Sequence, residues 1–209
     1  MRNLTRQRGF TLIELMVAVF ITAILFAIGY GAVNQAVKNR GALEQQQDRL
    51  IAIQTTMRTI AQDVNQLALR PIRDPNGNNW LPVLIATGSD QKKLVELTRG
   101  GWANPAGVQR PALQRVAYLF EDNTLRRQYW PVLDPLLSTD PVKKDLCTGV
   151  KSVKFRYMDV SRQWRDTWPP ASAVANQAQL NLRHRPIAVE VTLELNDWGK
   201  LVRVLEVPT

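Results

Sequence analysis

LMVAVFITAILFAIGYGAV, residues 15–33, is a run of nineteen residues without a charged side chain. As a helix it would be about 28 Å long, which is close to the ~30 Å hydrocarbon core of a bilayer. Three arginines, Arg2, Arg6 and Arg8, precede the run, and no acidic residue stands among them. Because basic flanks stay in the cytoplasm, we expect a single-pass protein of the inner (cytoplasmic) membrane with its C-terminal part in the periplasm.

Two simpler interpretations of this N-terminus compete with a processed anchor. A secretory signal peptide has a shorter apolar stretch and a small-residue cleavage site, and neither is found here. An uncleaved signal anchor explains the run and its basic flank but not Glu14. A carboxylate at the mouth of a membrane helix is costly without a partner. A cut after Gly9 would supply one, because Phe10 would gain a free ammonium group four residues before Glu14.

The octapeptide Arg8-Gly9-Phe10-Thr11-Leu12-Ile13-Glu14-Leu15 resembles the processing motif of type IV pilins and pseudopilins. The resemblance implies that a prepilin peptidase cuts after Gly9 and methylates the new amine of Phe10. It also implies that Glu14 recruits the subunit into a growing filament. Residues 1–9 would be a cleaved basic leader, and residues 10–33 the transmembrane helix segment.

After the run, apolar residues continue at heptad-like spacing among polar ones. This pattern predicts an amphipathic helix over residues 34–70 that continues from the anchor. It favours packing of the helix on the chain's own C-terminal domain, while coiled-coil dimerisation is the alternative. Pro71 should end the helix near Arg70. The apolar stripe consists of Leu43, Leu50, Ile53, Met57, Ile60, Val64 and Leu67.

From residue 71 to residue 209 the period changes to two, which is typical of half-buried strands. The clearest case is Val189 to Asn196, and Val153 to Tyr157 alternates in the same way. Asp122-Asn123 and Asn196 to Gly199 predict hairpin turns. The expected fold class is α+β and pilin-like: a long N-terminal transmembrane and amphipathic helix packed on an antiparallel β-sheet domain. Further strands are expected near Leu84 and over 93–98, 113–120, 125–130 and 201–207.

Several segments of this domain resemble the J-type minor pseudopilin of the bacterial type II secretion system. The resemblance implies a tip complex with the I-type and K-type minor subunits that initiates a pseudopilus and helps to export folded proteins across the outer membrane. It adds the H-type subunit, the major pseudopilin and the prepilin peptidase as further partners. The segments are RPIRDPNG, LVELTRGGWANPAG, LQRVAYLFEDNTLRRQYWPVLD, QWRDTWPP and PIAVEVTLEL.

Catalytic and metal-binding patterns are weak in this sequence, which predicts neither an enzyme nor a cofactor. One histidine, His184, and one cysteine, Cys147, do not make a zinc site, and no G-x-S-x-G elbow accompanies the histidine. We expect His184 at the surface and Cys147 as a buried or reduced thiol. The acids Asp134, Asp140 and Asp145 fall in a Pro-rich stretch that we expect to be a loop. Asp74, Asn76 and Asn78 favour an Asx-rich turn over a calcium loop.

Basic composition leaves a second function class open, a minor pilin of a type IV pilus or a DNA-uptake pseudopilus. The formal net charge is +9, or +6 after subtraction of the three leader arginines. Aromatic residues do not interleave with the arginines as in a nucleic-acid groove, so no nucleic-acid partner is expected. A solvated face, or one that meets an acidic neighbour subunit, is the favoured interpretation of the basic set. That set is Arg110, Arg115, Arg126, Arg127, Arg162 and Arg165. Trp164 and Trp168 are expected to pack in the core or in loops.

Overall fold

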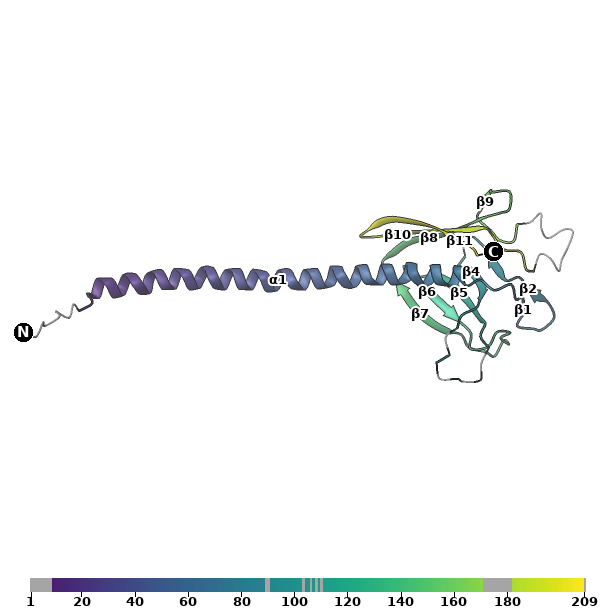
Figure 1. Ribbon diagram of the computed structural model, residues 1–209, viewed down its shortest axis with the longest axis horizontal. Coiled ribbons are helices and arrows are strands. Elements are labelled where there is room, and N and C mark those ends of the chain that lie inside the picture. The colour runs from purple at the N-terminus through teal and green to yellow at the C-terminus, as the bar shows by residue number, and fades with distance from the viewer. Residues whose placement is uncertain are drawn as a thin grey trace, which may run out of the picture. The chain divides into compact units, whose positions relative to one another are not determined.

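The computed structural model describes residues 9–88, 91–102, 104–105, 107, 109, 111–170 and 182–208. The chain divides into two compact units, residues Met1–Ile51 and Ala52–Thr209. The first unit is helical over its described residues after Thr11. The second contains the last turns of the same helix and all of the described strands (Figure 1).

The helix α1 spans Leu12–Asn65. It continues through Gly29, Gly31 and Gly41 without interruption. The prediction that it reaches Arg70 was wrong, because the backbone after Asn65 pairs with strand residues. The amide of Ala68 donates to the Thr98 carbonyl at 2.9 Å, and the amide of Gly100 donates to the Gln66 carbonyl at 2.7 Å.

The larger sheet has five antiparallel strands in the order β3-β4-β5-β6-β7. Asp122 and Asn123 connect β5 to β6 with φ angles of 50° and 54°, as the primed hairpin turns require. Strand β7 corrects the sequence-based expectation, because it includes Asp145 in a stretch that had been assigned to a loop. The strands are β3 Leu84–Ala86, β4 Lys93–Arg99, β5 Gln114–Glu121, β6 Thr124–Tyr129 and β7 Val142–Cys147.

A second sheet has the antiparallel order β11-β10-β8-β9, and the short strands β1 and β2 pair separately. In β10 the side chains alternate between buried and half-buried from Val189 to Leu195, as the period of two predicts. Gly199 opens β11 with φ +69°, so the predicted turn after β10 is confirmed. The strands are β8 Val150–Met158, β9 Trp164–Arg165, β10 Ala188–Leu195, β11 Gly199–Glu206, β1 Ile72–Arg73 and β2 Trp80–Leu81.

The core of the second unit combines both large sheets with one face of α1. The apolar stripe supplies this face, but only in part. Its C-terminal members Ile53, Met57, Ile60 and Val64 are buried, whereas Leu43 is 57% exposed. Packing of the helix on its own domain is therefore confirmed for the turns from Ile53 onward, and the expected α+β class, a long N-terminal helix with antiparallel sheets, is confirmed with it.

Candidate functional site

Gly9 and Phe10 precede the first turn of α1 in a non-helical segment. A Cβ atom placed on Gly9 would have no neighbour within 4 Å, and Phe10 is 83% exposed. The peptide bond between them is thus uncrowded on the chain itself. A protease that recognises this segment in extended form would not have to unwind the helix first.

Thr11 and Glu14 make a reciprocal capping arrangement at the start of α1. The Glu14 amide donates to the Thr11 hydroxyl oxygen at 3.3 Å, and the Thr11 amide donates to Glu14 Oε2 at 3.4 Å. This is the capping-box pattern, in which two otherwise unpaired helix N–H groups are satisfied. The sequence Thr-Leu-Ile-Glu could have predicted it from the three-residue spacing, but sequence reasoning assigned Glu14 only to the new amine and to neighbouring subunits.

The apolar run lies within α1 and is exposed along its whole length. Among the described residues, α1 is the one helix long and apolar enough to cross a membrane, and its most apolar 18-residue window has no buried side chain. Phe26, for example, is 74% exposed and Leu25 is 64% exposed. In water such a surface would be unfavourable, so a bilayer or other apolar helices must cover it.

Asp63 is the centre of a buried ionic cluster where α1 packs on the larger sheet. Its carboxylate accepts a hydrogen bond from Arg99 Nη1 at 2.6 Å, from Arg127 Nε at 2.7 Å and from the Tyr118 hydroxyl at 2.7 Å. These partners come from three neighbouring strands, β4, β5 and β6. The side chain of Asp63 is fully buried, and those of Arg99 and Arg127 are 9% and 11% exposed.

The cluster extends to Gln66 on the next part of the chain. Arg99 Nη2 donates to Gln66 Oε1, and its Nε donates to the Gly100 carbonyl at 2.9 Å. Gly101 sits against the same amide with φ +65°, and a Cβ atom there would meet Gln66 Nε2 at 2.6 Å. Glycine is thus favoured at this position by its positive φ, and a side chain there would also require the Gln66 amide to shift.

Burial keeps the Tyr118 hydroxyl of this cluster protonated. It raises the pKa of Tyr118 well above its ordinary value, and the nearby Asp63 carboxylate raises the pKa further. The hydroxyl therefore stays protonated and acts as a donor. Because two guanidinium groups and one hydroxyl surround a single carboxylate, the cluster holds α1 against three strands in one register.

A second buried ion pair lies in the same sheet, between Arg115 of β5 and Glu96 of β4. Arg115 Nε donates to Glu96 Oε1 at 2.9 Å, while Lys93 Nζ binds Glu96 Oε2 at 2.7 Å. Burial raises the pKa of Glu96, but the charges of Arg115 and Lys93 outweigh it, so the pKa is lowered from its ordinary value. Arg115 Nη1 also donates to the carbonyls of Pro82 and Val83.

Not all of the arginines that suggested a solvated basic face lie at the surface. Arg115 and Arg127 are engaged in the buried clusters, which corrects the prediction of a surface role for them. Arg126 pairs with Asp145 at 2.8 Å, and Arg165 pairs with Asp159 at 2.9 Å. Arg110 lies outside the described residues. Arg115 and Arg127 pair with acids that are distant in the sequence: 19 residues separate Arg115 from Glu96, and 64 separate Arg127 from Asp63. Their burial therefore depends on the tertiary fold.

Most other residues singled out from the sequence take part in packing or in turns. His184 is partly exposed, and its ring packs against Trp168 with centroids 5.0 Å apart, so the expected surface position is combined with a packing contact. Trp168 is in the core, as predicted, and Cys147 is buried. The Asp74 carboxylate accepts from the amides of Asn78 and Asn79, which confirms the Asx-rich turn.

The remaining acids of the predicted loop do not form a catalytic pair. Asp134 accepts a hydrogen bond from the Arg73 amide at 2.9 Å, Asp145 pairs with Arg126, and Asp140 is exposed. In the part of the chain that the structure describes, no three His, Cys, Asp or Glu side chains are grouped so that they could hold a metal ion. The described geometry thus offers an exposed apolar helix, an uncrowded segment before it and a helix–sheet junction held by buried charges.

Two family models together match nearly the whole chain. Residues 31–207 match the family "Type II secretion system (T2SS), protein J", and residues 4–30 match the "Prokaryotic N-terminal methylation motif". The chain is 28% identical over 201 residues to type II secretion system protein J of Escherichia coli, with 95% of this chain and 94% of that protein covered. It is 30% identical over 203 residues to protein J of Vibrio cholerae, with 94% and 85% covered.

A solved structure has a similar fold. The chain resembles a subunit in the crystal structure of the GspK-GspI-GspJ complex from the type 2 secretion system of enterotoxigenic Escherichia coli. The TM-score is 0.64 at 26% identity, and the match covers 77% of this chain and 98% of that one.

Proposed function

This chain belongs to the type II secretion system protein J family and is a minor pseudopilin, and we propose that it acts in the tip complex that initiates the pseudopilus. There it helps to export folded proteins across the outer membrane. The match of residues 31–207 to the protein J family carries the proposal. Its partners are other minor pseudopilins, and the I-type and K-type subunits correspond to the companions named in the similar solved complex.

We propose that maturation uses the exposed N-terminal segment. A prepilin peptidase removes residues 1–9 by cutting after Gly9, and the amine of Phe10 is then methylated. Support comes from the methylation motif over residues 4–30 and from the uncrowded Gly9–Phe10 segment. Mass spectrometry of the purified chain should find a mature N-terminus at Phe10 carrying one methyl group. Replacement of Gly9 by leucine should leave the leader attached.

Glu14 is proposed to act in assembly. In the precursor its carboxylate has a local partner in Thr11 at 3.4 Å, which is a weak contact by length. After the cut, the ammonium of Phe10 is a stronger partner, either on the same chain or at the terminus of a neighbouring subunit. The cut would thus give Glu14 a charged partner in place of a neutral one, and pairing with the ammonium of a neighbouring subunit would join the two subunits.

The protein is a single-pass inner-membrane protein, and we propose its orientation and domains. Residues 10–33 cross the membrane, residues 34–65 continue as the amphipathic part of the helix, and the residues after it form the periplasmic β-rich domain. The arginines on the N-terminal side support this orientation. The family is a structural component of the pseudopilus, and we propose that the chain catalyses no reaction. The H-type subunit, the major pseudopilin and the prepilin peptidase are further proposed partners.

Co-purification tests the tip-complex proposal. The tagged full-length chain is co-expressed with the I-type and K-type subunits of the same secretion system, and membranes are solubilised in mild detergent. Both partners should be retained on the tagged chain, and a labelled DNA duplex added to the same material should not. Retention of DNA without either partner would replace the proposal with the uptake-pilus alternative.

A further inference from the structure

The connection between β1 and β2 contains the one Asn-Gly pair of the sequence, Asn76-Gly77. Asparagine is a thermolabile residue, and its side-chain amide is lost fastest when glycine follows, because no Cβ atom hinders attack by the next backbone nitrogen. The side chain of Asn76 is exposed, and a Cβ atom placed on Gly77 would have no neighbour within 4 Å. Sterically, the folded chain leaves this pair open to reaction.

The attacking nitrogen is nevertheless occupied in the folded turn. The amide of Gly77 donates to the Asp74 carbonyl at 2.8 Å, which closes a turn over Pro75 and Asn76. Proline at the second position of such a turn presets its φ angle. To bond to Asn76 Cγ, the Gly77 nitrogen must give up its proton and with it this hydrogen bond. Reaction therefore requires the turn to open.

The Asp74 side chain fastens the rest of the connection. Its Oδ1 accepts from the amide of Asn78 at 2.8 Å and from that of Asn79 at 3.2 Å. The Asp74 amide donates in return to the Asn79 carbonyl at 2.9 Å. One carboxylate thus ties together the two sides of the Asn76-Gly77 pair, and its loss would make opening easier.

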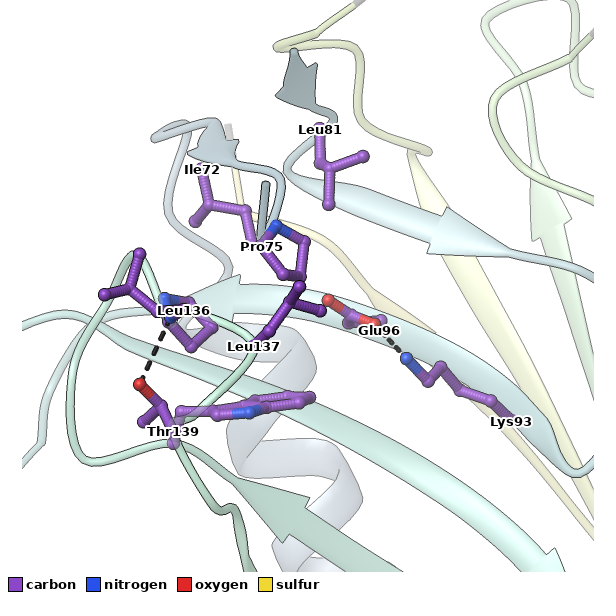
Figure 2. Close-up of a pocket in the computed structure, with 10 residues that line it drawn as sticks. Ile72, Pro75, Leu81, Lys93, Glu96, Leu136, Leu137 and Thr139 are labelled. Carbon is purple, nitrogen blue, oxygen red and sulfur yellow. Dashed lines mark hydrogen bonds and ion pairs between the residues drawn. The ribbon is translucent and has the colours of Figure 1, made fainter. Parts of the chain in front are cut away.

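The ribbon that carries the turn is short. Strands β1 and β2 pair through two residue pairs, Ile72 with Leu81 and Arg73 with Trp80. Figure 2 shows Pro75 among the side chains that line the same pocket as Ile72 and Leu81. The ribbon is separate from the two larger sheets. Because so few hydrogen bonds hold it, we expect it to open more often than they do.

We propose that Asn76 is a site of spontaneous deamidation that the closed turn keeps slow, so that its conversion marks chains in which the β1–β2 ribbon has opened. In the open turn the Gly77 amide nitrogen bonds to Asn76 Cγ, and ammonia leaves to give a cyclic succinimide. Water then adds to either carbonyl of the ring and yields aspartate or isoaspartate, without any oxidant or reductant. Isoaspartate routes the backbone through the former side chain and adds a methylene group to the turn.

Incubation of the full-length chain in detergent at mildly alkaline pH, folded or unfolded in guanidinium chloride, tests the proposal. Tryptic cleavage after Arg73 gives a peptide that also contains Asn78 and Asn79, which precede larger residues and are internal controls. Mass spectrometry should find conversion first at Asn76 in the unfolded chain. In the folded chain it should be slower by about tenfold or more, since only the open fraction reacts. Equal rates in both states, or equal conversion of the three asparagines when unfolded, would overturn the proposal.

Matched variants separate the turn from global unfolding. Asp74→Ala removes the acceptor of the Asn78 and Asn79 amides, so conversion in the folded chain should speed up several-fold. Asp74→Asn should stay near the parent rate, because its amide oxygen still accepts hydrogen bonds and the Pro75 nitrogen cannot attack the new side chain. Ile60→Ala weakens the core away from the turn and should also stay near that rate. No acceleration in Asp74→Ala, or equal acceleration in Ile60→Ala, would show that the turn does not protect Asn76.

Discussion

Both ends of α1 carry apolar side chains, but those of the N-terminal end are exposed and those of the C-terminal end are buried. From Leu15 to Val33 every side chain is exposed, and the apolar surface surrounds the helix. From Ile53 to Val64 the apolar residues follow one face, and that face is buried in a core shared with both sheets. The comparison teaches that an all-round apolar surface suits lipid or neighbouring helices, whereas a stripe with a single buried acid specifies one sheet in one register.

The largest effect on the domain is expected from Asp63→Asn. The substitution keeps the shape of the side chain but leaves Arg99 and Arg127 buried without their anion, which should cost about 3–5 kcal/mol of unfolding free energy. Chemical denaturation of the full-length chain, followed by near-UV circular dichroism, measures it. Asp145→Asn is the control, because Asp145 pairs with Arg126 in an exposed position, and its midpoint should hardly move. Similar losses in both variants would contradict the special role of the buried cluster.

A somewhat smaller loss is expected from Ile60→Ala. Ile60 is fully buried, so the cavity left behind should lower the unfolding free energy of the domain by about 2–5 kcal/mol. The counterpart on the other end of the helix is Ile28→Ala, where the side chain is 66% exposed. That variant should leave the unfolding transition of the domain in place. If Ile28→Ala destabilised the domain as strongly, the contrast between the two ends of α1 would be wrong.

Acid should weaken the domain through Glu96. Because the folded-state pKa is below the ordinary 4.5, ionised Glu96 contributes stability above that value. The contribution falls as the pH drops from about 4.5 through the folded-state pKa. Denaturation midpoints measured between pH 7 and pH 3 should therefore decline more steeply in the parent chain than in Glu96→Gln, which cannot titrate. Parallel declines would mean that other acids account for the pH dependence.

The smallest effect on the domain is expected from Glu14→Leu. Glu14 contacts only Thr11 among the hydrogen bonds of the described residues, so unfolding of the domain should be unchanged. Cleavage after Gly9 should remain intact, while incorporation into the pseudopilus and secretion should be impaired. Mass spectrometry reports cleavage, and secretion of exported proteins reports assembly. Normal secretion by this variant would remove the proposed role of Glu14.

Sequence patterns predicted the local features well. The apolar run, the stripe from Ile53 to Val64 and the alternation in β10 each depend on neighbours a few residues away, and all are present in the structure. The hairpin at Asp122-Asn123 follows from the backbone preference of its residues. Strand β7 escaped notice because Lys143, Lys144 and Asp145 are exposed together at a sheet edge, which removes the alternation that reveals a strand.

The buried charges were the main failure of sequence reasoning. Asp63 lies three residues after Ile60 and one before Val64, so an acid on the apolar face was a readable signal of a buried partner. What the partner is cannot be read locally, since Arg99 and Arg127 follow 36 and 64 residues later. The same holds for Arg115, which composition alone assigned to a basic surface.

The sequence by itself determined the anchor, the processing motif, the helix and the alternating strands, because each depends on side chains that are close along the chain. Only the tertiary structure decided which cations are buried, where α1 ends, and that Leu136 and Leu137 stay exposed. Those outcomes depend on which strands become neighbours, and the free energy of a charge or a leucine depends on what then surrounds it.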